Sequence, residues 1–188
     1  MTEQLHLITV IGLKRSGKTS VVEALVSELR ARGHQVGTVK TMRHHNVSLD
    51  VPGTDTRRHA DAGASVVLAL GSDGTARLEK GALPASLEEV AGHFPRSIRI
   101  LVSEGAIDPA NPHLVVLCLR ESSGLQETLD IRKVPRSSVA AISGRAASVW
   151  DPLQLPGVPS FDVTDPVQKK ALADLILGKI AQSERDPG

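Results

Sequence analysis

Residues 12–19 have the types and spacing of a phosphate-binding loop. Their sequence, GLKRSGKT, fits the pattern G-x-x-x-x-G-K-[ST] at every position. In such a loop the two glycines, Gly12 and Gly17, adopt backbone angles that other residues resist, so that successive N–H groups converge on phosphate oxygens. Lys18 is expected to reach the β- and γ-phosphates, and the Thr19 hydroxyl to bind Mg²⁺. The pattern predicts a nucleoside-triphosphate site.

The segments on either side of the loop are those that such a loop requires. The apolar run 5–11 predicts a buried strand, and residues 18–32 have the apolar spacing of a helix that ends before Gly33. The helix N-terminus adds a positive dipole end to the site. A chance match on an ordinary strand–turn–helix corner is therefore the weaker interpretation. The residues expected to contact the nucleotide are Gly12, Lys14, Arg15, Ser16, Gly17, Lys18, Thr19 and Ser20.

Three acidic residues are candidates for the metal site and for catalysis. Glu104 follows the apolar strand 99–103, where a phosphate-loop protein places a carboxylate near the metal, and one or two protein carboxylates suffice for Mg²⁺. Asp50 and Asp55 lie in or after the polar loop 42–53 that follows the second strand. We predict Asp50 as a metal ligand and Asp55 as a catalytic residue. A helix N-cap or a solvated loop acid is an equal alternative for both aspartates.

Basic and histidine side chains surround the second predicted strand. Lys40 ends that strand and is expected to add a second positive charge to the phosphate site, with a solvent-facing lysine as the alternative. His44 and His45 are adjacent, so their side chains point apart on an extended chain and form a poor metal-binding pair. Arg57 and Arg58 are candidates for a substrate phosphate, although a solvated helix face is the more frequent arrangement.

The composition disfavours several classes of protein. The net charge of +1 gives no reason to expect a polyanion or a membrane surface as partner, and aromatics at 2% disfavour base-stacking on single-stranded nucleic acid. A lone cysteine, Cys118, lies in the apolar run 114–119 and is expected to be a buried thiol, which excludes a disulfide scaffold. No apolar run approaches the roughly 20 residues of a membrane span, and the N-terminus has no basic segment ahead of a signal-type apolar core. We expect a cytoplasmic protein.

Strands and helices alternate along the chain. Further strands are predicted at 35–41, 65–70, 99–103, 114–119 and 139–143, with a hairpin partner at 75–79 and a short last strand at 160–163. Further helices are predicted at 54–62, 86–93 and from 166 onward. This order predicts a three-layer α/β/α phosphate-loop fold with a mostly parallel sheet. With no internal repeat and no convincing boundary, 1–188 is expected to form one domain with a polar tail at 183–188.

The stretch 40–64 carries a more specific resemblance. It contains Lys40, the pair His44-His45, the sequence Asp50-x-x-Gly53-x-Asp55-Thr56 and Ala62-Gly63-Ala64, in that order. Together with Glu104-Gly105 after a strand, these residues resemble the MobB family of molybdopterin-guanine dinucleotide biosynthesis adapter proteins. The resemblance covers about residues 5–105.

The resemblance implies a function as well as a fold. It implies the phosphate-loop NTPase fold shared with nickel-insertion GTPases, GTP binding with Mg²⁺ and slow hydrolysis, and a homodimer. The implied role is to assist a MobA-type nucleotidyltransferase in attaching GMP to molybdopterin. Two positions depart from the family pattern: Thr41 stands where a histidine is expected, and Ser143-Gly144-Arg145 stands where a guanine-reading aspartate is sought.

Three alternatives stay open. Catalysis in an NTPase would depend on Lys18, Mg²⁺ and backbone amides, and the chain has no obvious arginine finger or water-orienting glutamine, which predicts slow turnover. A small-molecule kinase would instead hold its acceptor with the 42–60 loop. A metallochaperone GTPase would use His44 and His45. An interaction module would use the nucleotide only to fix its shape.

Overall fold

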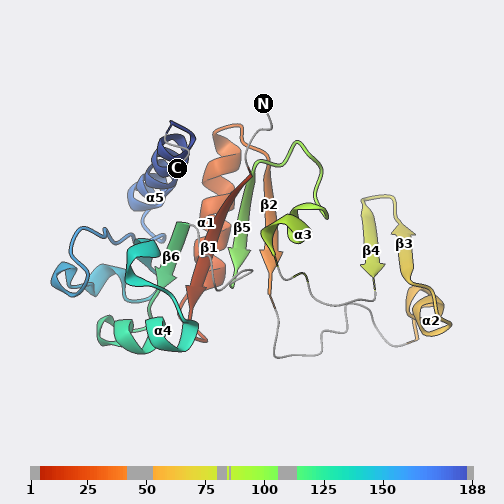
Figure 1. Cartoon of the computed structure of the whole chain (residues 1–188), viewed down its shortest axis with the longest axis horizontal. Coiled ribbons are helices and arrows are strands. Elements are labelled where there is room, and N and C mark those ends of the chain that lie inside the picture. The colour runs from red at the N-terminus through yellow and green to blue at the C-terminus, as the bar shows by residue number, and fades with distance from the viewer. Residues whose placement is uncertain (1–4, 42–52, 80–83, 85, 106–113, 186–188) are drawn as a thin grey trace. The chain divides into compact units, whose positions relative to one another are not determined.

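The computed structural model describes residues 5–41, 53–79, 84, 86–105 and 114–185 (Figure 1). These residues group into two compact units. One unit contains Met1–Thr41 and Ala85–Gly188, and the other contains Met42–Pro84.

The larger unit is built on a five-stranded sheet. All neighbouring strands are parallel, and their order is β2-β5-β1-β6-β7. The central strand β1 is buried along its whole length, as expected for a parallel sheet that is covered on both faces. The predicted parallel sheet is therefore confirmed. The strands are β1 (His6–Gly12), β2 (Val36–Lys40), β5 (Ile100–Glu104), β6 (Leu114–Cys118) and β7 (Val139–Ser143).

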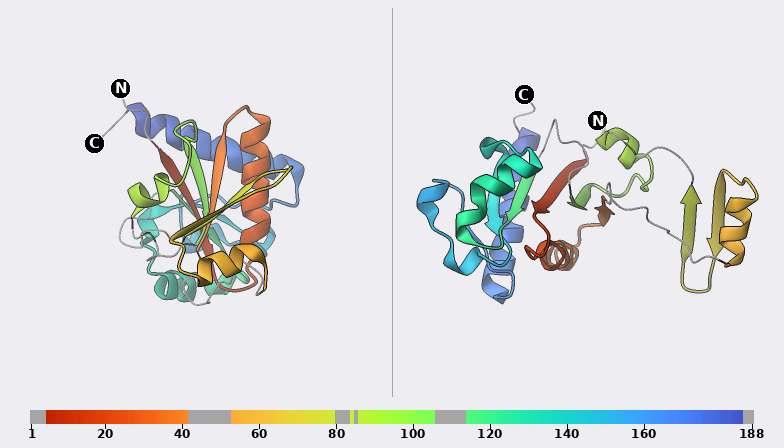
Figure 2. Two further views of the ribbon diagram at one scale, coloured as in Figure 1. Left: turned by 90° about the vertical axis from the view of Figure 1, so that its right-hand side faces the viewer. Right: turned by 90° about the horizontal axis from the view of Figure 1, so that it is seen from below.

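Helices cover both faces of this sheet. Alternate side chains of β1 face opposite layers: Val10 packs in a cluster with α1 and α5, whereas Ile11 packs in a cluster with α4. Figure 2 shows α1 and α5 crossing on their side of the sheet. The expected three layers are confirmed. The helices are α1 (Lys18–Ala31), α3 (Leu87–Ala91), α4 (Leu125–Arg132) and α5 (Pro166–Arg185).

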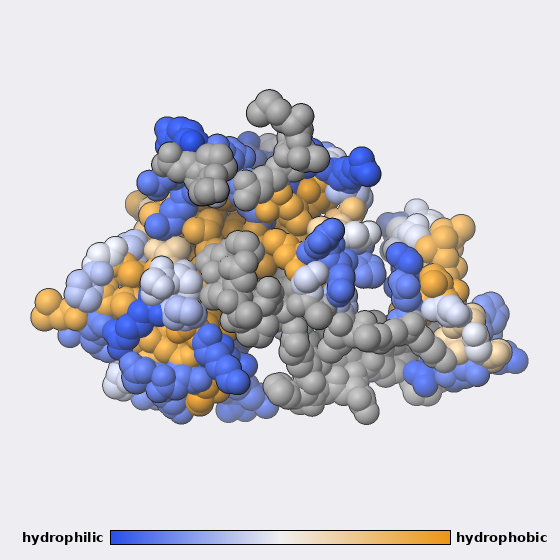
Figure 3. Space-filling model, viewed as in Figure 1, coloured by the Kyte–Doolittle hydropathy of each residue, from blue (hydrophilic) through white to orange (hydrophobic). Residues whose placement is uncertain are grey.

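The smaller unit is a helix followed by a hairpin. Helix α2 (Asp55–Asp61) is capped by the Thr54 hydroxyl, and strands β3 (Val66–Leu70) and β4 (Thr75–Glu79) pair antiparallel. The hairpin was expected, but among the described strands β3 pairs with β4 and is not part of the five-stranded sheet. Alternate residues of β3 expose an apolar stripe, visible in orange in Figure 3. Its members are Val66, Leu68 and Leu70, which are 44%, 57% and 77% exposed.

Two differences from the sequence-based expectations concern the C-terminal half. Helix α4 was not predicted, because LQETLDIR is short and mostly polar, yet Leu125 and Leu129 cover the sheet. The strand expected at 160–163 is reduced to one bridge, from Ile142 to Ser160.

Among the helices of the described segments, none combines the length and apolarity needed to cross a membrane. Short 3₁₀ turns lie at Ser122–Gly124, Arg136–Ser138, Ala147–Val149 and Pro152–Gln154.

A charged network joins α1 to α5. Arg32 donates to the Glu28 carboxylate at 2.7 Å and to Asp174 at 2.7 Å, and Lys169 lies 3.1 Å from the other Glu28 oxygen. The hydrogen bonds from Arg32 and Lys169 lower the pKa of Glu28 below its ordinary value of 4.5. The ionised carboxylate is thus favoured by the fold.

This network predicts a pH-dependent effect of Glu28→Gln. A depressed pKa contributes stability that is present above the unfolded-state pKa and is lost as the pH falls through the folded-state value. We expect the variant to be less stable than the wild type at about pH 7, and the gap to close as the pH falls below the ordinary value of 4.5 and through the lowered folded-state pKa. Urea unfolding across this range measures the difference in free energy of unfolding, with Glu127→Gln on the exposed face of α4 as the control. A gap that stays constant to the acid end would contradict the assignment.

Candidate functional site

The phosphate loop lies between the carboxyl end of β1 and the first turn of α1. Gly17 is the N-cap residue of α1 and has φ +94°, in the left-handed region where glycine is favoured. Arg15 also takes a left-handed angle, φ +64°. Gly12 does not, so the expectation that its backbone angle requires glycine is wrong. Its requirement is steric, because a Cβ there would overlap the Cys118 carbonyl oxygen and lie 2.6 Å from Ser16 Oγ.

Hydrogen-bond donors without acceptors converge at this loop. The Val21 N–H donates to Gly17 O at 3.2 Å, so the earlier amides of the first turn have no acceptor within the helix. The fully buried Ser16 hydroxyl has no hydrogen-bond partner among the described residues. Lys18 Nζ folds back and donates to Leu13 O at 2.7 Å. This arrangement suits a ligand that is rich in acceptor oxygens, such as a phosphate chain.

The electrostatic setting of Lys18 also favours an anion. Burial lowers the pKa of Lys18 from its ordinary value of 10.5, and the positive charge of Arg132 at the end of α4 lowers it further. Glu104 opposes this effect only in part. An anionic ligand beside Lys18 would offset both costs.

Thr19, Glu104 and Lys40 meet at one corner of the loop. Thr19 Oγ1 donates to Glu104 Oε2 at 3.1 Å, and Lys40 Nζ lies 3.4 Å from the same oxygen. The parallel register aligns Lys40 with Glu104, and Glu104 with Val10, two residues before the end of β1. The Thr41 N–H donates to Glu104 O at 3.1 Å, which anchors the strand end. A hydroxyl and a carboxylate are the oxygen donors that Mg²⁺ takes, so this pair fits the predicted ion.

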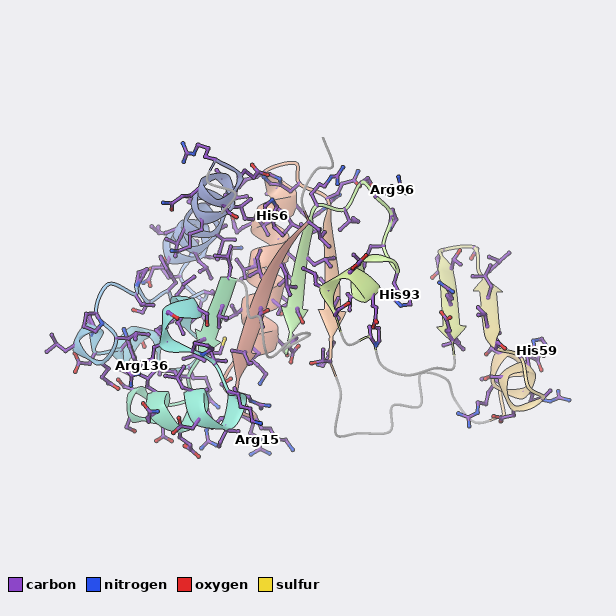
Figure 4. The ribbon with its side chains drawn as sticks, in the orientation of Figure 1. His6, Arg15, His59, His93, Arg96 and Arg136 are labelled. Atoms are coloured by element: carbon purple, nitrogen blue, oxygen red, sulfur yellow. The ribbon has the colours of Figure 1, made fainter. Side chains whose placement is uncertain are left out.

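A hollow of about 500 Å³ lies over the loop. Figure 4 labels Arg15 beyond the arrowhead of β1, whereas His6 lies near the start of that strand. The hollow thus opens at the carboxyl edge of the sheet, where ligands bind in open α/β folds. The described residues that line it are Lys14, Arg15, Ser16, Gly17, Lys18, Thr19, Ser20, Glu104 and Arg145.

The turn after β7 belongs to this site, although no role was predicted for it. The Arg145 N–H donates to Ser16 O at 3.1 Å, and a Cβ on Gly144 would overlap the same oxygen. Gly144 has φ +84°. One sequence signal was available: like Gly12 and Gly105, Gly144 follows or ends an apolar strand at the carboxyl edge.

The remaining predicted residues lie in the smaller unit or outside the described residues. Asp50, His44 and His45 lie outside the described residues. Asp55 begins α2 in the Met42–Pro84 unit, where its 86% exposed side chain lies 3.4 Å from Arg58, so its catalytic role stays a prediction. In the same helix Arg57 bonds Asp61 at 3.0 Å. Across the described segments, no group of three or more His, Cys, Asp or Glu residues is arranged to hold a metal ion.

Cys118 lies directly beneath the loop. It is fully buried, as predicted, and burial raises the pKa of its thiol to about 12. At neutral pH the group is a protonated thiol that packs against the loop and is a poor nucleophile.

Comparison with known proteins identifies relatives. The family model for molybdopterin guanine dinucleotide synthesis protein B, MobB, matches residues 7–142. A molybdopterin-guanine dinucleotide biosynthesis adapter protein of Haemophilus influenzae is 35% identical over 102 residues. That match covers 54% of this chain and 57% of the relative, so the chain spans little more than half of the relative's length.

Solved structures share the fold. The crystal structure of Bacillus subtilis MobB superposes with a TM-score of 0.69 at 21% identity and covers 90% of this chain and 96% of that chain. A MobB protein homolog from Bacillus stearothermophilus has a TM-score of 0.60 at 20% identity, with coverage of 91% and 98%. At such identities the likeness concerns the fold alone.

Proposed function

The chain belongs to the MobB family, and on that premise we propose that it is a Mg²⁺-dependent GTP-binding protein that acts as an adapter in molybdenum cofactor biosynthesis. The observation that carries the nucleotide part is the contact between Thr19 Oγ1 and Glu104 Oε2 at the mouth of a complete phosphate loop. A hydroxyl from the loop and a strand-end carboxylate are the two protein ligands that a nucleotide-bound Mg²⁺ requires.

The chain's own residues would bind the triphosphate mainly through positive charge and oriented amides. Lys18 would leave Leu13 O and bind the β- and γ-phosphates, while the amides from Gly17 onward donate to the other phosphate oxygens. Thr19 and Glu104 would hold Mg²⁺, which supplies charge neutralisation when bound. The described residues lining the hollow include no glutamine to orient a water molecule. We therefore expect slow hydrolysis.

The adapter part of the proposal rests on family membership. The Haemophilus influenzae relative is named for molybdopterin-guanine dinucleotide biosynthesis. We propose that this chain assists a MobA-type nucleotidyltransferase in attaching GMP to molybdopterin. A homodimer is part of the same proposal, and the exposed apolar stripe on β3 (Val66, Leu68 and Leu70) supports it as a surface available for protein contacts.

A nucleotide titration tests the proposal. Calorimetry with GTP and with ATP, in Mg²⁺ and in EDTA, should show GTP binding that Mg²⁺ strengthens. Glu104→Gln should weaken GTP binding in Mg²⁺ by about tenfold but should not weaken it in EDTA, because without the metal the carboxylate only repels the phosphates. Glu127→Gln on α4 is the matched control. Failure of the wild type to bind either nucleotide would contradict the proposed nucleotide binding.

A further inference from the structure

The metal corner and the Arg145 turn lie on opposite sides of the phosphate loop. Glu104 and Lys40 come from β5 and β2, which lie on one side of β1 in the sheet. Arg145 follows β7, which lies on the other side, beyond β6. A triphosphate whose Mg²⁺-bound end lies at Thr19 and Glu104 therefore directs its nucleoside towards Arg145.

The backbone of the Arg145 turn is held by several hydrogen bonds. Arg145 N–H donates to Ser16 O at 3.1 Å, and Ala146 N–H donates to Leu119 O at 3.0 Å. Gly144 lies 3.3 Å from the position of a Cβ on Gly17, so the turn packs against the phosphate loop itself. The backbone from which the Arg145 side chain extends is consequently fixed relative to the loop.

The guanidinium group of Arg145 is available to a ligand. Arg145 is exposed and lines the hollow over the loop, and within the described segments no carboxylate forms an ion pair with it. The one acidic side chain among the described lining residues, Glu104, belongs to the metal corner. The nucleoside side of the hollow thus presents donors and no carboxylate in the described part of the chain.

We propose that Arg145 determines base specificity by donating to O6 and N7 of guanine. An arginine fork matches the two acceptors on that edge, whereas adenine presents an amino donor in place of O6. Reading these two acceptors replaces the missing guanine-reading aspartate, which would accept from N1–H and the 2-amino group on the Watson–Crick edge. The inference deepens the proposed function and rests on it.

The test compares nucleotide analogues by calorimetric titration in Mg²⁺. GTP, ATP, ITP, which lacks the 2-amino group, and 7-deaza-GTP, which lacks N7, are titrated into the wild type. They are also titrated into Arg145→Ala, Arg145→Lys and the control Arg96→Ala, whose side chain is exposed at the opposite end of the sheet (Figure 4). Circular dichroism checks that each variant is folded.

The expected pattern is specific to the edge that is read. In the wild type, ITP should bind like GTP, while 7-deaza-GTP and ATP bind about tenfold more weakly. Arg145→Ala should reduce GTP affinity about tenfold, to the level of ATP, and leave ATP affinity unchanged. Arg145→Lys should behave more like the alanine variant, because a lysine lacks the fork.

Other patterns overturn the inference. An equal loss of GTP and ATP affinity in Arg145→Ala would make Arg145 a phosphate ligand. A wild type that loses affinity for ITP but not for 7-deaza-GTP would read the Watson–Crick edge. Equal binding of GTP and ATP by the wild type would contradict base reading by Arg145 but leave the proposed nucleotide binding at the phosphate loop intact. Binding of no nucleotide would instead remove the proposed function itself.

Discussion

Lys18→Ala should weaken GTP binding by about 100-fold or more. Lys18 provides a charged donor in a partly buried site, and losing a charge-assisted contact to a phosphate costs about 3 kcal/mol, which corresponds to that factor. The fold should not suffer, because the substitution removes one bond, from Nζ to Leu13 O at 2.7 Å. It also removes a positive charge from a place where burial and the charge of Arg132 already lower the pKa of Lys18. Titration with GTP in Mg²⁺ measures the affinity.

One control variant and one stability measurement make this test of Lys18 decisive. Lys170→Ala removes an exposed lysine from α5 and should leave GTP affinity unchanged. Urea unfolding of Lys18→Ala should give a free energy of unfolding equal to or slightly above that of the wild type. If GTP affinity in folded Lys18→Ala stayed within about threefold of the wild type, the phosphate assignment would fail.

The sequence predicts the loop well because its determinants are local. Strand, glycine-rich turn and helix follow one another within residues 6–31, and each has its own pattern. Glu104 was also predictable, since parallel strands bring their carboxyl ends to one edge of the sheet. The meeting of Lys40 and Glu104 follows from the same rule, because the register of β2 on β5 aligns them.

The remaining parts depend on contacts that no local pattern encodes. Helix α4 has a weak apolar face and is stabilised by the sheet that it covers. Strand β3 has an ordinary strand pattern, but pairing decides that it forms a hairpin with β4. The position of Gly144 after an apolar strand is visible in the sequence, but its packing against Ser16, far away along the chain, follows only from the placement of β7 in the sheet.

Gly12 is the loop position where the smallest addition should have the largest structural effect. An alanine Cβ would overlap the Cys118 carbonyl oxygen, lie 2.6 Å from Ser16 Oγ and lie 3.1 Å from Cys118 Cβ. All these atoms belong to buried residues, and Gly12 pairs with Cys118 in the sheet, so either β6 or the loop must shift. Gly12→Ala should lower the free energy of unfolding by about 3 kcal/mol. It should also abolish GTP binding, since the amides lose their positions.

The same substitution at Gly178 should change the free energy of unfolding in the opposite direction. Gly178 lies within α5, and among the described residues no atom outside its chain neighbours and the helix's own backbone lies within 4 Å of an added Cβ. Alanine there should raise the free energy of unfolding by about 0.5–1 kcal/mol and leave GTP binding intact. Urea unfolding and GTP titration of both variants separate crowding at the loop from any general effect of replacing glycine. Equal stability of the two variants would mean that β1 and β6 approach less closely at Gly12 than the structure places them.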